Sequence, residues 1–301
     1  MTMHQIAKNS PQTLASALYQ RSGESPVLGN TALYENVLDG LSRFLSSNRE
    51  ETTEILRFPP VMSRAQVEHS GYHKSFPHLL GCVCSMHGSE AEVRSVVNSA
   101  GSSWTEAVDA TDLVLTPAAC YPLYPMAASR GAVPANGYKF DIASYCFRRE
   151  ATSELGRLQS FRMREFVRVG TPEQAFDFRA RWMPHAEELA QRLGLPYQIA
   201  AASDPFFGRA GKLMAASQVE QSLKFELLIP IRHGEEPTAC MSFNYHRDQF
   251  GTTWNIQAES GAAAHSACVA FGMDRLTLAL FATHGVEIAA WPQGVRAALS
   301  L

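Results

Sequence analysis

Two neighbouring segments carry arginine, glutamate and phenylalanine residues, and the spacing of the arginines would allow them to bind a phosphate. The stretches 141–150 (DIASYCFRRE) and 160–170 (SFRMREFVRVG) alternate apolar and polar residues, which predicts a long-looped antiparallel hairpin. Period two places Arg148 and Glu150 on one face of the first strand, and an aromatic side chain and Glu165 on one face of the return strand. An arginine can fork onto a phosphate, whereas each charge taken alone could equally form a salt bridge on a solvated face.

The joint pattern of this hairpin is more specific than its single charges. Phe147-Arg148-Arg149-Glu150, then Arg157 in the loop and then Phe161, resembles motif 2 of the class II aminoacyl-tRNA synthetases. The resemblance implies that Arg148 contacts the α-phosphate of ATP, that Glu150 meets the adenine edge and that Arg157 binds phosphates. It also implies that Phe161 stacks on the adenine ring.

A second motif lies near the C-terminus, in residues 262–285 (AAAHSACVAFGMDRLTLALFATHG). This Ala- and Leu-rich stretch predicts a helix that stops at Gly285, with Cys268 and Arg275 on one face about 10 Å apart. Its GMDRL segment resembles class II motif 3, whose arginine, here Arg275, contacts the γ-phosphate. An ordinary ion pair with Asp274 is the alternative for this arginine.

Between the two motifs, residues 222–230 (SLKFELLIP) and 238–250 (TACMSFNYHRDQF) predict a second pair of strands and resemble elements of seryl-tRNA synthetases. Lys224 is a possible ATP ligand, or a lysine that snorkels at a strand edge. Arg148 and Arg275 are the predicted catalytic residues. The complete ATP-binding set that the resemblance implies is Arg148, Glu150, Arg157, Leu158, Phe161, Lys224, Ala239, Cys240, Met241, Ser242 and Arg275.

The six cysteines are too scattered for a disulfide framework and are expected to be reduced thiols. Cys82 and Cys84 are expected on one face of a strand, as small buried residues. The atypical seryl-tRNA synthetases of methanogens have a Cys-Glu-Cys zinc site, and Cys120, Glu165 and Cys268 occupy the corresponding places. The resemblance implies that they bind Zn²⁺, with Glu165 also at the substrate amino acid and the fourth metal position open to its α-amino group.

The predicted fold class is α+β, a class II synthetase-like antiparallel sheet flanked by helices. We expect an N-terminal helical appendage over 1–50 and a catalytic domain over 51–301, with a small insertion at about 172–221 between motifs 2 and 3. Thr171 and Gln174 predict a capping box that starts a helix packed on the sheet. The turn-rich part of the insertion, 196–221, is where partner specificity is expected.

Composition bears on the partners. The formal net charge of −3 and the pI of about 6.4 argue against tRNA as a partner. No apolar run is long enough to span a bilayer, and the N-terminus lacks a signal-peptide centre, so a cytoplasmic protein is expected.

The compact length and residues 57–82 (RFPPVMSRAQVEHSGYHKSFPHLLGC) resemble the bacterial glycine-type amino acid:[carrier protein] ligases. This resemblance implies activation of a small amino acid, glycine first, alanine second and serine third, with ATP and Mg²⁺. The aminoacyl group would then pass to the phosphopantetheine thiol of a carrier protein. It further implies a homodimer with motif 1 at the interface, for which the RFPP segment is the candidate.

Three alternatives remain open at this point: a minimal seryl-tRNA synthetase, a non-catalytic synthetase paralogue and a structural zinc protein. The arginine set Arg148, Arg157 and Arg275 argues against the last two.

Overall fold

The computed structural model describes residues 11–21, 27–99, 104–150, 155–231 and 236–301. The helices are α2 (Pro11–Leu18), α3 (Ala32–Ser47), α4 (Arg64–Ser70), α5 (Tyr72–Ser75), α6 (Glu90–Asn98), α7 (Leu123–Ala128), α8 (Pro172–Arg192), α9 (Gly208–Glu220), α10 (Gln249–Trp254), α11 (Met273–His284) and α12 (Gln293–Leu299). The strands are β1 (Tyr19–Arg21), β2 (Leu28–Asn30), β3 (Glu54–Arg57), β4 (Val61–Ser63), β5 (Cys82–Met86), β6 (Val108–Leu115), β7 (Tyr138–Phe147), β8 (Ser160–Gly170), β9 (Gln198–Ala201), β10 (Lys224–Ile229), β11 (Thr238–Arg247) and β12 (His265–Gly272).

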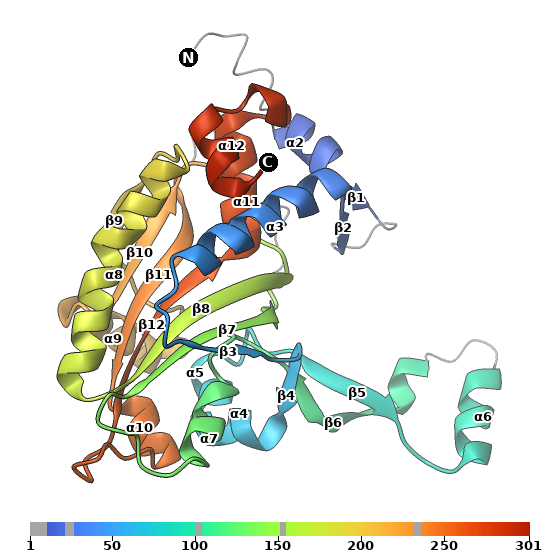
Figure 1. The fold of residues 1–301 in the computed structure, drawn as a ribbon. Coiled ribbons are helices and arrows are strands. Elements are labelled where there is room, and N and C mark those ends of the chain that lie inside the picture. Colours follow the sequence, from blue (N-terminus) through green and yellow to red (C-terminus); the bar gives the residue numbers. More distant parts are fainter. Residues whose placement is uncertain (1–10, 22–26, 100–103, 151–154, 232–235) are drawn as a thin grey trace.

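A large sheet organises the described part of the chain. Its seven strands run in the order β3-β7-β8-β12-β11-β10-β9, and every neighbouring pair is antiparallel except β3 with β7. Figure 1 shows α3, α8, α11 and α12 along one side of this sheet, while the small β4-β6-β5 sheet and α6 project sideways. The predicted α+β architecture, an antiparallel sheet flanked by helices, is confirmed.

The predicted hairpin is confirmed as β7 and β8, with Ile142 opposite Glu165. The first strand ends at Phe147, however, so Arg148 and Glu150 do not continue its alternation as predicted. The Arg148 N–H still donates across the hairpin to Gln159 O at 2.9 Å, but the next N–H, that of Arg149, donates to Leu79 O at 3.1 Å, outside the hairpin.

The helix predicted after the hairpin is α8. Thr171 and Gln174 form the predicted capping box, which satisfies two backbone N–H groups at the helix start. Phe178 and Trp182 on its buried face pack against the sheet in the main hydrophobic cluster. This prediction is therefore confirmed.

The helix predicted over 262–285 is wrong in its first half. Residues 265–272 form the strand β12 between β11 and β8, and the helix α11 begins only at Met273. Val269 packs into the core cluster under α3, α8 and α11, and Cys268 packs into the cluster on the opposite face. A strand buried on both faces is continuously apolar, and periodicity alone does not distinguish it from a buried helix.

Two further predictions differ from the structure. Cys82 and Cys84 lie in a strand as expected, but both are exposed, because β5 belongs to the projecting small sheet. Residues 196–221 are not mainly turns, since they contain β9, which extends the main sheet, and the 13-residue helix α9.

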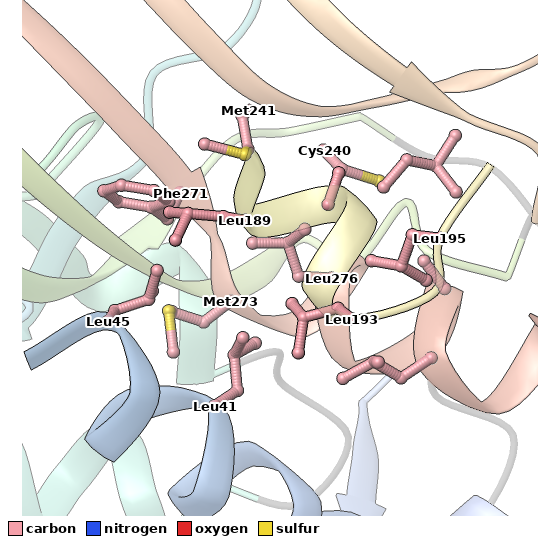
Figure 2. Packing of buried hydrophobic residues seen from close by; sticks show 14 of the residues in the cluster. Leu41, Leu45, Leu189, Leu193, Leu195, Cys240, Met241, Phe271, Met273 and Leu276 are labelled. Carbon is pink, nitrogen blue, oxygen red and sulfur yellow. The ribbon is translucent and has the colours of Figure 1, made fainter. Parts of the chain in front are cut away.

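The main hydrophobic cluster joins segments far apart in the sequence. Leu41 and Leu45 of α3 pack beside Phe271, Met273 and residues of α8 (Figure 2). The division of the chain at residue 50 stays a prediction, but α3 shares its core with the rest of the fold. Among the described residues, no helix is both long and apolar enough to cross a membrane.

Candidate active site

A cavity of about 350 Å³ lies on the sheet face opposite α3. Its walls come from β8, β10, β11 and β12, from the chain after β7 and from the start of α11. The predicted site residues that line it are Cys120, Arg148, Glu150, Leu158, Phe161, Glu165, Lys224, Ala239, Cys240, Met241, Ser242, Cys268 and Arg275. The remaining one, Arg157, forms an ion pair with Glu150 at 3.0 Å.

Strand register explains why these residues meet. Successive side chains of a strand point to opposite faces, so Phe161, Met163 and Glu165 of β8 all face the cavity. In the neighbouring strands, Glu165 lies opposite Ala270 and Cys268 lies opposite Asn244. Residues separated by about a hundred positions thus become neighbours across three strands.

One end of the cavity holds two arginines. The Arg148 Nε donates to Pro117 O at 3.3 Å, and its guanidinium lies 5.5 Å from the centre of the Phe161 ring. The Arg275 Nε and Nη1 each donate to a backbone carbonyl at 3.0 Å, those of Gly156 and Ala239. Burial lowers the pKa of Arg275, which is the mark of a cation taken out of water without full compensation.

The alternative role for Arg275, an ion pair with Asp274, is wrong. Asp274 instead pairs with Arg162, whose Nη2 lies 2.7 Å from Asp274 Oδ1. In the part of the chain that the structure describes, no carboxylate forms an ion pair with Arg148 or Arg275. Among the residues that the structure describes, both guanidinium groups therefore lack an anionic partner at a cavity wall, where an anionic ligand would complete their pairing.

Lys224 is buried at the cavity wall and is already paired with two carboxylates. It is only 9% exposed, so it does not snorkel to solvent, and its ammonium lies 2.6 Å from Asp204 Oδ1 and 3.1 Å from Glu226 Oε1. Burial opposes its charge, but the two carboxylates outweigh burial and raise the pKa of Lys224. The ammonium faces the cavity already paired, unlike the two arginines.

The other end of the cavity holds the three predicted metal ligands. Glu165 Oε1 accepts a hydrogen bond of 3.0 Å from the backbone N–H of Cys120, and the Cys120 and Cys268 thiols interact with each other and with the carboxylate. Burial raises the pKa of Glu165 despite these hydrogen bonds. The hydrogen bond with Cys268, burial and the nearby Glu165 charge raise the pKa of Cys120 well above its usual range.

The chemistry of this cluster suits zinc, although its geometry is not that of a formed metal site. Within the described residues, no group of three or more His, Cys, Asp or Glu side chains is arranged to hold a metal ion. Two thiols and one carboxylate are nevertheless zinc donors, and they meet in a buried place where loss of hydration disfavours their charged forms and raises the pKa of Glu165 and of Cys268.

Sequence reasoning missed several polar residues of the cavity, among them Asn244, His246 and Asp204. Asn244 donates to Cys268 Sγ at 3.3 Å, and His246 Nε2 lies 3.7 Å from the same sulfur. Burial lowers the pKa of His246 to about 4, so its imidazole is neutral. Asp204 pairs with Lys224. Alternation along β11 could have placed Ser242, Asn244 and His246 on one face, but no local pattern marks Asp204.

The fold and the cavity define the class of protein. Residues 104–284 match the tRNA synthetase class II core domain (G, H, P, S and T), which is more than half of the chain. In fold, the chain resembles the M. kandleri seryl-tRNA synthetase solved with A. aeolicus tRNASec, with a TM-score of 0.80 at 18% identity over 95% of this chain and 59% of that one. It also resembles the ATP complex of the Pyrococcus horikoshii seryl-tRNA synthetase, with a TM-score of 0.64 at 16% identity over 90% of this chain and 57% of that one. This is a class II synthetase-like catalytic domain.

Closer relatives narrow the family. Amino acid–[acyl-carrier-protein] ligase 1 of Bradyrhizobium diazoefficiens is 56% identical to this chain, over 98% of this chain and 94% of its own length. Amino acid–[acyl-carrier-protein] ligase 2 of the same organism is 58% identical, over 96% of this chain and 87% of its own length. The type-2 serine–tRNA ligase of Methanopyrus kandleri is 28% identical over 60% of this chain and 37% of its own. The chain belongs to the amino acid–[acyl-carrier-protein] ligases, and it is a ligase.

Proposed function

We propose that this ligase activates a small amino acid with ATP and transfers it to the phosphopantetheine thiol of a carrier protein. The preferred amino acid is glycine, then alanine. One observation carries the proposal: two arginines without a carboxylate partner among the described residues share a cavity with a buried thiol–carboxylate cluster. The names of the relatives identical at 56% and 58% support the same acceptor.

In the first step, a carboxylate oxygen of the amino acid attacks the α-phosphorus of ATP, and pyrophosphate leaves. Arg148 binds the α-phosphate, where negative charge builds, and Arg275 binds the γ-phosphate. Phe161 stacks on adenine, Glu150 meets its edge and Arg157 binds phosphates. Mg²⁺ accompanying ATP would supply positive charge to the phosphates.

Further residues complete the nucleotide site in this proposal. Lys224 and its two carboxylate partners, Asp204 and Glu226, all line the cavity. The Lys224 ammonium therefore binds the nucleotide by exchanging one of these carboxylates for a phosphate. The strand β11 forms one wall of the ATP pocket. The remaining ATP-binding residues are Ala239, Cys240, Met241 and Ser242 of this strand, and Leu158.

At the other end, Cys120, Glu165 and Cys268 would hold Zn²⁺, which would supply a Lewis acid for the α-amino group of the substrate. Each end of the cavity thereby binds one substrate: the thiol cluster orients the amino acid, and the arginines orient ATP. Such fixed orientation brings the carboxylate close to the α-phosphorus.

In the second step, the pantetheine sulfur attacks the carbonyl carbon of the adenylate. A thioester forms, AMP leaves with the electron pair of the broken C–O bond, and the thiol proton goes to solvent. We propose that α9 recognises the carrier, because Met214 and Gln218 line the cavity while Leu213 on the same helix is 72% exposed.

We also propose a homodimer with the RFPP segment, residues 57–60, at the interface. The segment follows β3, which is one of the two edge strands of the main sheet, and Ile55 on this strand is 50% exposed. An exposed apolar residue on an unpaired edge suits a buried interface. Sedimentation of the purified protein tests this, and a monomer at micromolar concentration would contradict it.

A minimal seryl-tRNA synthetase is the second candidate, supported by the similarity to the type-2 serine–tRNA ligases. Transfer of labelled glycine, alanine and serine, with ATP and zinc, separates the two. The acceptors are a phosphopantetheine-loaded carrier protein, the same carrier without the group, and bulk tRNA. Label on the loaded carrier alone is expected, and label on tRNA would overturn the proposal.

A further inference from the structure

The residue before Arg275 is held by groups from outside its own helix. Asp274 Oδ2 accepts from the backbone N–H of Arg162 at 2.5 Å, and Oδ1 lies 2.7 Å from Arg162 Nη2. The hydroxyl of Tyr34, in the first turn of α3, lies 3.0 Å from the same Oδ1. The carboxylate is thus shared between the hairpin and a helix from the first fifty residues.

Tyr34 fixes the backbone of this turn as well as the side chain. Its hydroxyl lies 3.1 Å from the backbone carbonyl of Asp274, and its ring stacks on Phe281 of α11 at 6.4 Å. Tyr34 is 0% exposed, so these contacts are shielded from water. Through them α3 holds both the start and the middle of α11.

A second link ties the same arginine to α3. Arg162 Nη1 donates to Glu35 Oε2 at 2.6 Å, and Glu35 is held in turn by Asn30 at 2.7 Å. Asp274 and Arg162 both line the cavity, so this network forms part of its wall.

The direction of Arg275 depends on this network because little else orients it. The N-cap residue of α11 is Gly272, which has no side chain to cap the helix. The guanidinium is held only by two backbone carbonyls in the described structure. A neutral hydrogen bond is weaker than one to a carboxylate, so the orientation of the first turn of α11 decides where the guanidinium points.

We propose that Tyr34 is a positioning residue for ATP: its hydroxyl orients the first turn of α11, through Asp274, so that Arg275 points into the cavity. The helix α3 therefore acts on the nucleotide site without contacting it. This inference rests on the proposed role of Arg275 at the γ-phosphate.

The test compares Tyr34→Phe with Tyr19→Phe. Tyr19 lies 5.4 Å from Tyr34, ring centre to ring centre, in the same core, and in the described structure it makes no hydrogen bond to Asp274. In amino-acid-dependent ATP–pyrophosphate exchange, Tyr34→Phe should raise the KM for ATP about tenfold, the effect of one hydrogen bond to a charged group. The kcat should change little, the melting temperature should fall by a few degrees because the buried hydrogen bond also stabilises the fold, and Tyr19→Phe should leave the KM for ATP unchanged. Equal effects of both substitutions, or a loss of thermal stability with an unchanged KM for ATP, would overturn the inference.

A double-substitution cycle separates this inference from the proposed function. The dissociation constant for ATP is measured for Tyr34→Phe in the wild-type and in the Arg275→Lys background. If Tyr34 acts through Arg275, its effect should shrink from about tenfold to less than about twofold when Arg275 is replaced. Equal effects in both backgrounds overturn the positioning role alone, whereas an Arg275→Lys protein that binds ATP like the wild type overturns the proposed role of Arg275.

Discussion

Asp141 and Glu165 are both buried carboxylates of the β7–β8 hairpin, but they lie on its opposite faces. Asp141 is 0% exposed, and Arg164 Nη2 lies 2.6 Å from its Oδ2. Burial opposes its charge, yet the bond and charge of Arg164 and the nearby Arg49 hold the pKa of Asp141 below its usual value. Glu165 is 1% exposed among thiols, and burial raises its pKa.

The difference shows how one hairpin separates structure from function. The chain supplies its own cations to Asp141, so this face holds α3 against the sheet. It supplies none in ion-pair contact to Glu165 within the described residues, and a buried carboxylate without a cation is unfavourable unless a ligand compensates it. On the cavity face the charge of Glu165 is thus left for a ligand to compensate, as is common in active sites. The following predictions test this difference between the two faces of the hairpin.

The largest effect is expected at the thiol end. Cys120→Ala, Glu165→Ala or Cys268→Ala should abolish zinc binding and adenylate formation together, because each removes one of three donors. Metal analysis and ATP–pyrophosphate exchange of the same preparations measure both. The control is Cys146→Ala, a buried cysteine of β7 outside the cluster, which should keep zinc. Full activity in a zinc-free variant would end the metal hypothesis.

A smaller loss is expected at the arginine end. Arg148→Ala and Arg275→Ala should each lower the exchange rate by about 10²–10³-fold, since in the proposed mechanism each removes a cation that binds the ATP phosphates. Zinc content should stay at the wild-type level, which distinguishes this end of the cavity from the other. Arg94→Ala, which alters an exposed ion pair on α6, is the control. Zinc loss in an arginine variant would show that the two ends are not separate.

On the opposite face, Asp141→Asn should lower the free energy of unfolding by about 3–5 kcal/mol at neutral pH, because Arg164 stays buried without its partner. The pKa of Asp141 is lowered in the folded state, so its stabilisation is present above the unfolded pKa and is lost as pH falls through the folded pKa. The difference in free energy of unfolding between the wild type and Asp141→Asn should therefore become smaller below about pH 4.

Urea denaturation across this pH range measures this difference. The matched control is Asp112→Asn, whose carboxylate pairs with Arg64 but whose side chain is 96% exposed. It should change stability little at any pH. A difference for Asp141→Asn that does not depend on pH would mean that the ion pair is not its source.

The smallest effect is expected for the outermost arginine around Asp141. The Arg57 side chain is 48% exposed and lies 3.3 Å from Asp141 Oδ1, so Arg57→Ala should cost less than about 1 kcal/mol. Arg164→Ala, whose side chain is 2% exposed, should lose several times more. Similar losses in urea denaturation for the two variants would show that burial does not rank these arginines.

Local patterns predicted much of the fold. The capping box at Thr171 and the alternation of 160–170 each depend on residues within a few positions, and both are confirmed. The strand over 265–272 was predicted as helix because burial on both faces removes the alternation that marks a strand. The exposure of Cys82 and Cys84 was missed because it depends on a small sheet that projects from the body.

The sequence by itself determined the class of the protein, since the arginine motifs and the strand pattern identified a class II synthetase-like domain. Almost every site residue that it named lines the cavity. Only the tertiary structure decided how those residues are partnered: Lys224 with Asp204 and Glu226, Asp274 with Tyr34 and Arg162. The physical reason is that an ion pair or hydrogen bond depends on distance in space, and strand pairing and helix packing bring together groups as far apart in the sequence as Tyr34 and Asp274, which are separated by 240 positions.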